Sequence, residues 1–597
     1  MPGIGDPASW QRWITSLLHG PLAGLRGSGG ESLERVSQAA LRSIAERLLI
    51  SLARERLVES ERMADCLTLR LPGEAAPIRL PLARLGAFEL DRPALATREP
   101  SEPRLAHWLA HPLELVDRLG LDESARLRVR AELASSIDHL ASARLAGSIR
   151  HRIALEERSG DDPRLNDPRL NDPEHFVIDG HPWHPMTRTR IGLGRADSLR
   201  HAPELLAGCA LAMVEVDEGI ARVSGDWLER AAVLGPAGAP SPGWVRVPVH
   251  PVLRRRLPRL FPELWGTTIR PLATPPILAR PLLSLRTVAL PDPHHHLKLA
   301  IGIHTTSARR VVSPMSVRDG PTISALLERI QARDPATRSL AIMSEPAAVG
   351  LEPEQVGPAA RELGAILRRV PEGPGQAWVC AALGERWPGS DETVLERASA
   401  GFPGGRAERV GAALEVWFTR LVPPLLRLFV GHGVALEAHL QNTLVMVEQG
   451  RPIGFRMRDL GGIRLHRGRL REAGHAPSFD AESFVITEDL DEVRGKLAHA
   501  LVHAQFAHLF EIAESLGVPE SRSWARLATT IDDRLRAWAS DPSEAPHLRE
   551  AAALERVELF TPQVRAKALL RMRLSERFSD YEYTRVDNVL ASARARP

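Results

Sequence analysis

The chain has 597 residues, more than one hydrophobic core usually organises, so about three or four structural units are expected. Charged residues make up 25% and apolar residues 44%, which excludes a disordered or fibrous chain. The formal net charge is only +3, which excludes a strong field over the whole molecule that would attract nucleic acid but allows a local cationic pocket.

Lysine is rare in this chain. Only three of the 77 basic residues are lysines: Lys298, Lys496 and Lys567. A GC-rich coding bias explains most of the arginine excess. An ammonium is a compact point charge whereas a guanidinium is a planar fork, so each lysine is worth considering as a functional group.

The chain carries no pattern for secretion or for membrane insertion. Its first residues, MPGIGDPASW, lack a basic stretch followed by an apolar one. The most apolar stretch, 421–436, contains two prolines and an arginine, so it is a poor membrane span. The three cysteines are far apart and form no CxxC pair, which argues against a disulfide framework or a zinc ribbon. We therefore expect a cytoplasmic protein with no membrane partner.

The first 150 residues are predicted to be mainly helical. Apolar residues recur at helical spacing in 31–59 and 104–148. Alternating runs at 67–71 and 78–82 flank Pro72-Gly73 and predict a hairpin. The DPRLN repeat at 161–172 predicts a polar loop close to a domain boundary.

The rest of the chain mixes strands and helices without a regular βαβ alternation, which predicts an α+β fold. We expect a helix at 322–333 with Thr322 as its N-cap, and a helix at 406–430 bent at Pro423-Pro424. The region after residue 490 is predicted to be helical. Gln449-Gly450 predicts a turn between the last two of the following expected strands: 245–249, 282–288, 297–304, 339–343, 434–439, 443–447 and 453–458.

Common nucleotide and hydrolase motifs are absent from the sequence. It has no GxxxxGK[ST] P-loop, no HExxH and no GxSxG. Any nucleotide chemistry must therefore use another kind of site.

The first motif is GHPWHP at 180–185, followed by Arg188 and Arg190. Two prolines hold the backbone in a non-helical conformation, from which His181 and His184 project. Histidine and guanidinium groups together suit phosphate or carboxylate oxygens. The simpler interpretation is a structural loop whose histidines bond to backbone carbonyls, but the density of the cluster favours anion binding.

The second motif is cationic. Ser284 and Arg286 are expected on one face of a strand, with Thr287 beside them. Lys298 lies in the next strand-like run, and TTSARR at 305–310 follows. Ammonium, guanidinium and hydroxyl groups together suit a triphosphate and a polycarboxylate, although an exposed basic sheet face would give the same pattern. The three consecutive histidines at 294–296 alternate faces on a strand and are interpreted as a solvated strand entry.

The third motif is acidic. Glu437, His439 and Gln441 are expected on one strand face, followed by Asn442 and, after a hairpin, by Asp459. Carboxylate and amide oxygens are ligands that Mg²⁺ accepts, and Mg²⁺ usually keeps waters and bridges substrate phosphates. Taken alone, such an acidic pair is usually a solvated face, so its interpretation depends on the preceding motifs.

These motifs, in this order, resemble those of the NRPS-independent siderophore (NIS) synthetases, the aerobactin-synthetase-like family. The similar segments are GHPWHP, SLRT, the lysine with TTSARR, EAHLQN and RDLGG, and they span about 175–590. Leu440 stands where glycine is common, and Arg188 where lysine is common. These departures leave the substrate subclass open.

The resemblance implies a cupped hand with three parts: a mainly helical thumb (1–160), fingers with a central, mainly antiparallel sheet (161–400) and an α/β palm (401–597). It implies an ATP- and Mg²⁺-dependent ligase, often a homodimer, that adenylates a carboxylate such as citrate and condenses it with an amine, hydroxylamine or alcohol. The implied nucleotide residues are Ser284, Arg286, Thr287, Lys298, Gln441 and Asn442. The implied carboxylate-binding residues are Thr306, Arg310, His439, Arg188 and Arg190. The implied metal ligands are Glu437, Asn442 and Asp459, and the implied catalytic groups are Lys298, Arg310, His439, His181 and His184.

Three other functions fit parts of the pattern. A small-molecule kinase could use the same nucleotide site, and a non-catalytic protein could bind a carboxylate or ferric ligand. A nucleic-acid-binding protein is suggested by the pI of about 9.0, but the dispersed arginines and only two tyrosines argue against it.

Overall fold

The structure is a computed structural model. It describes residues 33–94, 102–157, 172–205, 208–234, 240–305, 308–575 and 582–594. The DPRLN repeat, apart from Asp172, lies outside the described residues, as does Thr306.

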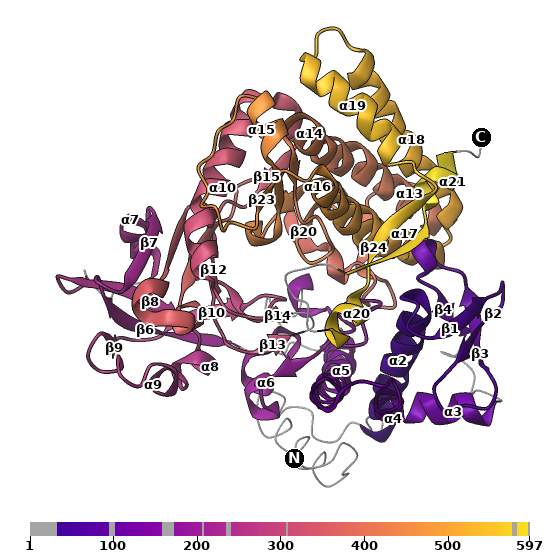
Figure 1. Cartoon of the computed structure of the whole chain (residues 1–597), viewed down its shortest axis with the longest axis horizontal. Helices are drawn as coiled ribbons and strands as arrows, with labels where there is room; N and C mark the ends of the chain where they lie inside the picture. The colour runs from indigo at the N-terminus through magenta and orange to yellow at the C-terminus, as the bar shows by residue number, and fades with distance from the viewer. Residues whose placement is uncertain are drawn as a thin grey trace.

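The N-terminal region combines long helices with a small antiparallel meander (Figure 1). The predicted hairpin around Pro72-Gly73 is confirmed, and its strands pair through Leu69 and Ile78. The first helix ends at Arg54, earlier than predicted, because Arg56 adopts a left-handed conformation and the chain then enters a strand. The helices are α2 (Leu33–Arg54), α3 (Pro103–Ala110), α4 (Pro112–Asp117) and α5 (Glu123–Glu157). The strands are β1 (Glu59–Arg62), β2 (Cys66–Arg70), β3 (Ile78–Arg84) and β4 (Arg92–Pro93).

A nine-stranded sheet forms the central region, and all of its pairings are antiparallel. Its order is β7-β16-β17-β12-β11-β10-β6-β8, with β9 paired to β6. Helix α10 (Pro314–Arg333) packs against β16 and β7. The mainly antiparallel central sheet was therefore predicted correctly. The strands are β6 (Cys209–Asp217), β7 (Ala221–Gly225), β8 (Trp244–Val249), β9 (Ile269–Pro271), β10 (Ile277–Pro281), β11 (Thr287–Ala289), β12 (His295–Leu299), β16 (Ala347–Leu351) and β17 (Ala365–Arg369).

Two predictions in this region were wrong. The strand expected at 282–288 is a turn between β10 and β11, in which Leu285 has a φ of 66°. The helix expected to begin at Thr322 begins at Pro314, where the Ser313 side chain accepts a hydrogen bond from the Ser316 amide. Pro314 supports this start because its missing N–H is not needed at the first helical position. Pro321 is nevertheless accommodated inside the helix.

The C-terminal region is a four-stranded mixed sheet covered by helices. The order is β15-β21-β20-β18, in which only the β15–β21 pair is parallel. Gln449 and Gly450 both have positive φ angles and form the predicted turn between β20 and β21. The strands are β15 (Leu340–Ile342), β18 (Gln376–Val379), β20 (Thr443–Glu448) and β21 (Arg451–Met457). The covering helices include α13 (Arg406–Val416), α14 (Val422–His432), α16 (Leu490–Leu497), α17 (Ala507–Ser515), α18 (Glu520–Ser540) and α19 (Pro546–Glu558).

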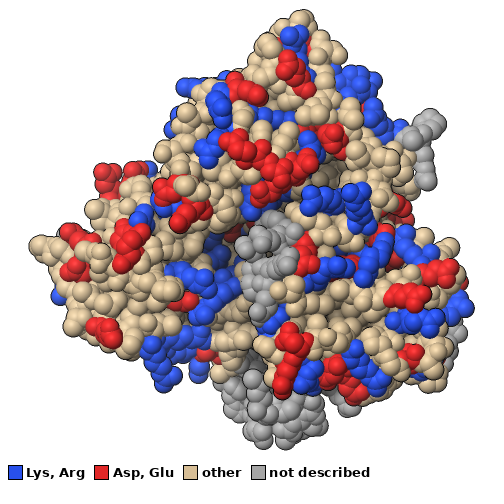
Figure 2. Space-filling model, in the orientation of Figure 1, with Lys and Arg blue, Asp and Glu red and all other residues tan. Residues whose placement is uncertain are grey.

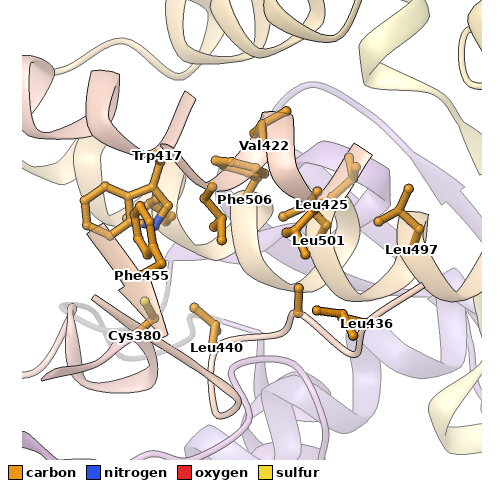
Figure 3. Close-up of a cluster of buried hydrophobic side chains, with 14 of the residues drawn as sticks. Cys380, Trp417, Val422, Leu425, Leu436, Leu440, Phe455, Leu497, Leu501 and Phe506 are labelled. Carbon is orange, nitrogen blue, oxygen red and sulfur yellow. The ribbon is translucent and has the colours of Figure 1, made fainter. Parts of the chain in front are cut away.

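Two π-helical segments run through the core of this region, at 417–421 and 498–506. The first lies immediately before Pro423-Pro424, where a bend was predicted, and its wider turn accommodates two residues, neither of which can donate a backbone hydrogen bond. The second carries Leu501 and Phe506, which pack in the same buried cluster as Trp417 and Phe455 (Figure 3).

The region after residue 490 was predicted to be helical, but it also contains strands. Strands β24 (Gln563–Lys567) and β25 (Tyr583–Asp587) form an antiparallel pair. Between them, α20 (Leu569–Leu574) lies against α2 and α5 (Figure 1), and Leu570 joins the N-terminal hydrophobic core. The buried Glu55 side chain accepts hydrogen bonds from the amides of Leu570 and Arg571 at 2.9 and 2.6 Å. The two ends of the chain thus share a core.

The structure is of the α+β class, with hydrophobic clusters centred on the N-terminal, central and C-terminal regions. The domain boundaries at 160 and 400 stay predictions. On the face shown in Figure 2, basic and acidic residues are interspersed, and neither sign covers a continuous face. No described helix is long and apolar enough to cross a bilayer.

Candidate active site

The cationic and acidic motifs meet in a buried ion pair. Lys298 lies on β12, and its ammonium is 2.5 Å from the Asp459 carboxylate, 161 residues further along the chain. Asp459 follows β21 in a left-handed conformation, with a φ of 68°. Burial alone would raise the pKa of Asp459, but the charges of Lys298, Arg368 and Arg286 outweigh it and hold the pKa well below its usual range. The two half-sites predicted from the sequence are therefore one site.

The hydroxyl and guanidinium groups beside Lys298 are arranged by a turn. Ser284 Oγ donates to Thr287 Oγ1 at 2.9 Å and accepts from the Thr287 amide at 3.2 Å. Thr287 is also the cross-strand neighbour of Lys298 in the β11–β12 register. The prediction that Ser284 and Arg286 share a strand face was wrong, because the left-handed Leu285 separates them. The turn still gathers these groups next to Lys298.

Arg286 and Arg310 bring two further positive charges to this site. Burial, followed by the charge of Arg310, lowers the pKa of Arg286 to about 10, so its guanidinium remains charged at neutral pH. The Arg286 guanidinium donates to the carbonyl of Val311, and Arg310 donates to the hydroxyl of Thr305.

A second buried ion pair at this site was not predicted. Arg368 on β17 and Glu345 are each 1% exposed and lie 2.8 Å apart. Arg368 contributes to the low pKa of Asp459. Its strand follows an ordinary pattern, so nothing in the sequence marked it, and its place beside Lys298 comes only from the β12–β17 pairing.

The acidic motif is a loop and not the predicted strand, because β19 (Val434–Ala435) ends before it. The amide nitrogen of Asn442 donates to the carbonyl of Glu437 at 3.2 Å and lies 3.4 Å from His439 Nε2. The Gln441 backbone amide donates to His439 Nδ1 at 3.2 Å. Burial lowers the pKa of His439, so its imidazole is neutral at pH 7. Local turns, rather than strand alternation, therefore place these side chains.

Leu440 anchors this loop. Its side chain is 8% exposed and belongs to the C-terminal hydrophobic cluster. The segment carrying Leu436 and Leu440 runs along the helix that carries Leu497 and Leu501 (Figure 3). A leucine at the position where glycine is common thus packs in the core and leaves the neighbouring His439 at the site.

The other two lysines of the chain lie beside Glu437. Lys496 on α16 places its ammonium 3.0 Å from Glu437 Oε1. Lys567 ends β24, and burial, followed by the charge of Lys496, holds its pKa well below the usual value. Burial would raise the pKa of Glu437, but the charges of Lys496, His439 and Lys567 lower it to about 2. All three lysines of the chain are therefore at the site, although only Lys298 was assigned there from the sequence; their rarity was the available signal.

A buried bridge joins the loops of the two half-sites. Arg458 pairs with Glu174, and both side chains are almost fully buried. Arg458 also donates to the carbonyl of Gln441 through two nitrogens, at 3.0 and 2.8 Å. The same Glu174 carboxylate accepts a hydrogen bond from the Leu283 amide at 2.9 Å. One ion pair therefore ties the turn that carries Ser284 to the loop that carries His439; Glu174 was not predicted.

The GHPWHP loop places two neutral histidines near the acidic loop. The Nδ1 atoms of His181 and His184 accept hydrogen bonds from the amides of Trp183 and Met186, which fixes both rings. Burial, followed by the charge of His439, lowers the pKa of His181 to about 3. The Nε2 atom of His184 has no hydrogen-bond partner in the described part of the chain. Both imidazoles can therefore donate hydrogen bonds through Nε2 without carrying charge at pH 7.

Arg188 and Arg190, predicted to bind substrate, pair with an unpredicted carboxylate. Arg190 lies 2.7 Å and Arg188 3.7 Å from Glu204, and all three side chains are buried. Arg188 also donates to the carbonyls of Val177 and Ile178. These contacts hold the segment before the GHPWHP loop, so both arginines serve here to position it.

We expect Glu204→Gln to lower the free energy of unfolding by about 3 kcal/mol at pH 7, because it leaves two buried guanidiniums short of a counter-charge. The pKa of Glu204 is lowered to about 2: burial opposes ionisation, but Arg190 and Arg188 outweigh it. A lowered pKa stabilises the fold above the unfolded pKa of about 4.5, and this contribution is lost as the pH falls towards 2. Denaturant melts should show the gap between wild type and variant closing over this range; a pH-independent gap would contradict it.

Two consecutive glycines, Gly461 and Gly462, separate the two acidic groups. A Cβ on Gly462 would lie 2.0 Å from Glu437 Oε2, and one on Gly461 would lie 3.6 Å from Lys298 Nζ. At Gly462 the backbone therefore approaches Glu437 more closely than a side chain would permit, whereas a Cβ on Gly461 would make an ordinary contact.

Gly462→Ala is expected to lower turnover at least ~10-fold with little change in melting temperature, because the new methyl group must displace the Glu437 carboxylate by more than the ~1 Å that is costly in a preorganised site. Gly454→Ala on β21 is the matched control, since a Cβ there meets nothing within 4 Å. Equal turnover in the two variants would show that the position of Glu437 is unimportant.

The donor set fits a hard cation. The described residues contain no cluster of three or more His, Cys, Asp and Glu side chains that could hold a metal ion. Glu437 and Asp459 nevertheless offer carboxylates on either side of the glycine pair, and Asn442 offers an amide oxygen. Mg²⁺ is commonly held by one or two carboxylates together with substrate phosphates and waters. Near the entry to β12, His295 Nδ1 lies 2.7 Å from Asp292.

Comparison with known proteins identifies the architecture. The IucA / IucC family matches residues 169–385, and the ferric iron reductase FhuF-like transporter family matches residues 414–581. The chain is 28% identical to a staphyloferrin A synthase of Staphylococcus aureus, over 70% of this chain and 72% of the relative. It is 28% identical to the NRPS-independent siderophore synthetase-like protein ankE of Aspergillus thermomutatus, over 94% and 95% of the two chains.

This chain is related to the NRPS-independent siderophore synthetases. The resemblance predicted from the sequence is confirmed. The chain also shares the fold of the petrobactin biosynthesis protein AsbB of Bacillus anthracis, with a TM-score of 0.74, 18% identity and 98% of both chains covered. ATP-bound aerobactin synthetase IucA of Klebsiella pneumoniae gives a TM-score of 0.71 at 20% identity, over 92% of this chain and 99% of the neighbour.

Proposed function

We propose that this protein is an ATP-dependent ligase of siderophore biosynthesis that adenylates a citrate-type carboxylate and transfers the acyl group to an amine, hydroxylamine or alcohol. The observation that carries the proposal is the direct contact between the cationic motif and the acidic motif at Lys298 and Asp459. The relationship to these synthetases supports the same reaction class, and related proteins include an L-2,3-diaminopropanoate–citrate ligase of Staphylococcus aureus.

ATP phosphates are assigned to the cationic side of the site. Attack of a carboxylate oxygen on the α-phosphorus brings two anions together, and the bond to pyrophosphate breaks. Lys298 and Arg286 offset the repulsion and stabilise charge on the phosphoryl oxygens. Ser284 and Thr287 supply hydroxyls from the adjoining turn. Gln441 and Asn442 lie in the loop tied to this turn by the Arg458–Glu174 pair, in reach of the same nucleotide.

The carboxylate substrate is assigned to the space between the two ion pairs. Arg310 interacts electrostatically with both Asp459 and Glu437, and His439 does so as well. Lys496 and Lys567 add positive charge on the Glu437 side, which suits the further carboxylates of a citrate-type substrate. Thr306, which lies outside the described residues, stays a predicted contact.

Magnesium is assigned to Glu437, Asn442 and Asp459. When bound, Mg²⁺ would neutralise phosphate charge and act as a Lewis acid. Lys298 and Lys496 pair with the two carboxylates and lower the pKa of each, so both acids are ionised and able to bind a cation.

The second half-reaction needs a base rather than a covalent catalyst. The nucleophile attacks the acyl carbonyl, AMP leaves, and the attacking nitrogen or oxygen loses a proton. The departing AMP phosphate or water takes that proton, because the Nδ1 atoms of the neutral His439, His181 and His184 already accept backbone hydrogen bonds. Their Nε2–H groups are suited to donate to the acyl oxygen as negative charge develops on it. We further propose a cytoplasmic homodimer.

Product analysis tests the reaction class. Purified protein is incubated with ATP, one carboxylate from a panel (citrate, 2-oxoglutarate, succinyl derivatives) and one polyamine or hydroxylated diamine, and the products are identified by mass spectrometry. We expect AMP, pyrophosphate and an amide or ester. ADP with a phosphorylated product would instead identify a kinase.

The FhuF-like match does not favour a reductase reaction. Residues 414–581 contain no cysteine, so this segment has no thiolates to bind an iron–sulfur cluster.

A further inference from the structure

A cavity outside the active site lies beside the segment that precedes the GHPWHP loop. It has a volume of about 600 Å³, in the range of small-molecule sites, and opens between α2, α5 and the turn at 385–388. The two helices lie side by side in Figure 1. None of the lining residues is assigned to the nucleotide, carboxylate or metal of the active site.

The lining combines guanidinium groups with an apolar wall. Phe176 and Ile178 contribute apolar surface, and the Arg150 guanidinium lies 5.7 Å from the centre of the Phe176 ring. Arg150 is only 4% exposed, and its Nε has no hydrogen-bond partner within the described residues. His151 Nδ1 is likewise buried and, as far as the structure is described, lacks a partner. The other lining arginines are Arg35, Arg144 and Arg386.

The single lining carboxylate does not neutralise this wall. Burial, followed by the charge of Asp179, raises the pKa of Glu385 to about 7, so at neutral pH it carries only part of a negative charge. Arg144 is paired with Asp179, and Arg386 lies 3.7 Å from the exposed Asp391. The buried Arg150 donates to the carbonyl of Glu204 but makes no ion pair with a carboxylate in the described part of the chain, so an anion in the cavity would supply its missing counter-charge.

The cavity wall is bonded to the loop that carries the active-site histidines. Glu385 accepts hydrogen bonds from the amides of Ile178 and Asp179, at 2.7 and 3.3 Å. Arg144 donates to both oxygens of the Asp179 carboxylate, at 2.9 and 2.7 Å. His181 follows two residues later. A ligand that engages Arg144 or displaces Glu385 would therefore move the backbone that positions His181.

We propose that this cavity is a regulatory binding site for a small organic carboxylate with an apolar body. Its carboxylate would pair with Arg150 and Arg386 and bond to His151, while its apolar part would pack on Phe176 and Ile178. Occupancy changes the affinity of the active site for its own carboxylate through Ile178 and Asp179.

Calorimetric titration of the full chain with benzoate and with octanoate tests the binding site, with benzamide as the uncharged control. We expect saturable binding of the carboxylates and none of the amide, and the carboxylate binding should remain saturable at saturating ATP and citrate, with its affinity changed by the same factor as the citrate affinity. Arg386→Ala, at an exposed position, should weaken binding about 5- to 10-fold, as loss of one charged hydrogen bond does. Arg526→Ala, an exposed arginine on α18, should leave it unchanged. No saturable binding, or displacement by citrate, would overturn the site.

Steady-state kinetics tests the regulatory role, which rests on the proposed ligase activity. Bound benzoate should change the KM for citrate about 5-fold or more. Arg386→Ala should raise the benzoate concentration that gives half of this change by the same factor as it weakens binding, without altering the KM measured in the absence of benzoate. An unchanged KM in benzoate-saturated enzyme would overturn regulation. Absence of any ligase activity would refute the proposed function instead, leaving the calorimetric result to decide the site.

Discussion

Lys298→Met is expected to lower turnover by ~10²-fold or more, because it removes a preorganised charge from the position where phosphoryl charge develops. Arg310→Ala should have an effect of similar size on the carboxylate side. Methionine keeps the length and apolar stem of lysine, so packing on β12 should survive. Pyrophosphate release at saturating substrates is the measurement.

Loss of Lys298 alone also leaves the half-buried Asp459 without its partner, which should cost less than the ~3–5 kcal/mol of a fully buried pair. The double variant Lys298→Met/Asp459→Asn removes both charges. It should regain most of the lost stability in denaturant melts and remain inactive. A double variant that recovers activity together with stability would show that Lys298 serves only the fold.

Arg458→Met is expected to give the second large effect. It breaks the buried pair with Glu174 and frees the Gln441 carbonyl, so we expect a loss of ~3–5 kcal/mol of unfolding free energy. The Ser284 turn and the His439 loop would then no longer be held together. The KM for ATP and the KM for the carboxylate should therefore both rise.

Glu174→Gln separates this coupling from simple destabilisation. Glutamine retains one oxygen to accept from the Leu283 amide, so the turn keeps its anchor while the ion pair is lost. We expect turnover to fall in this variant at temperatures where circular dichroism shows a folded chain. Arg469→Met, which breaks a buried pair with Glu555 on α19, controls for the loss of a buried arginine away from the site. Similar kinetics in Glu174→Gln and in this control variant would contradict a coupling role for Arg458.

The sequence predicted the chemistry of the site better than its backbone. Lys298, Asp459 and Glu437 were identified because their residue types and order suit a nucleotide, a metal and a carboxylate. The local structure of the segments that form the site was predicted wrongly in two places, 282–288 and 434–439. Both segments have strand-like composition, yet Leu285 adopts a left-handed conformation and the chain after Ala435 forms successive turns.

The residues that sequence reasoning missed depend on long-range pairing. Glu174, Glu204, Glu345 and Arg368 are ordinary charged residues in the sequence, and each finds its partner only when distant segments pack. Lys496 and Lys567 are different, since three lysines in an arginine-rich chain formed a visible anomaly. Assigning each lysine to the site as a functional group, as was done for Lys298, would have located both.

The central claim is that the joined site activates a carboxylate by adenylation. Carboxylate-dependent exchange of labelled pyrophosphate into ATP, measured without any amine, tests it most directly, because only a reversible acyl-adenylate step returns label to ATP. We predict exchange with citrate or a citrate derivative in the wild-type chain, and its loss in Lys298→Met. No exchange with any carboxylate of the panel, in protein that forms amide product and ADP, would contradict the account.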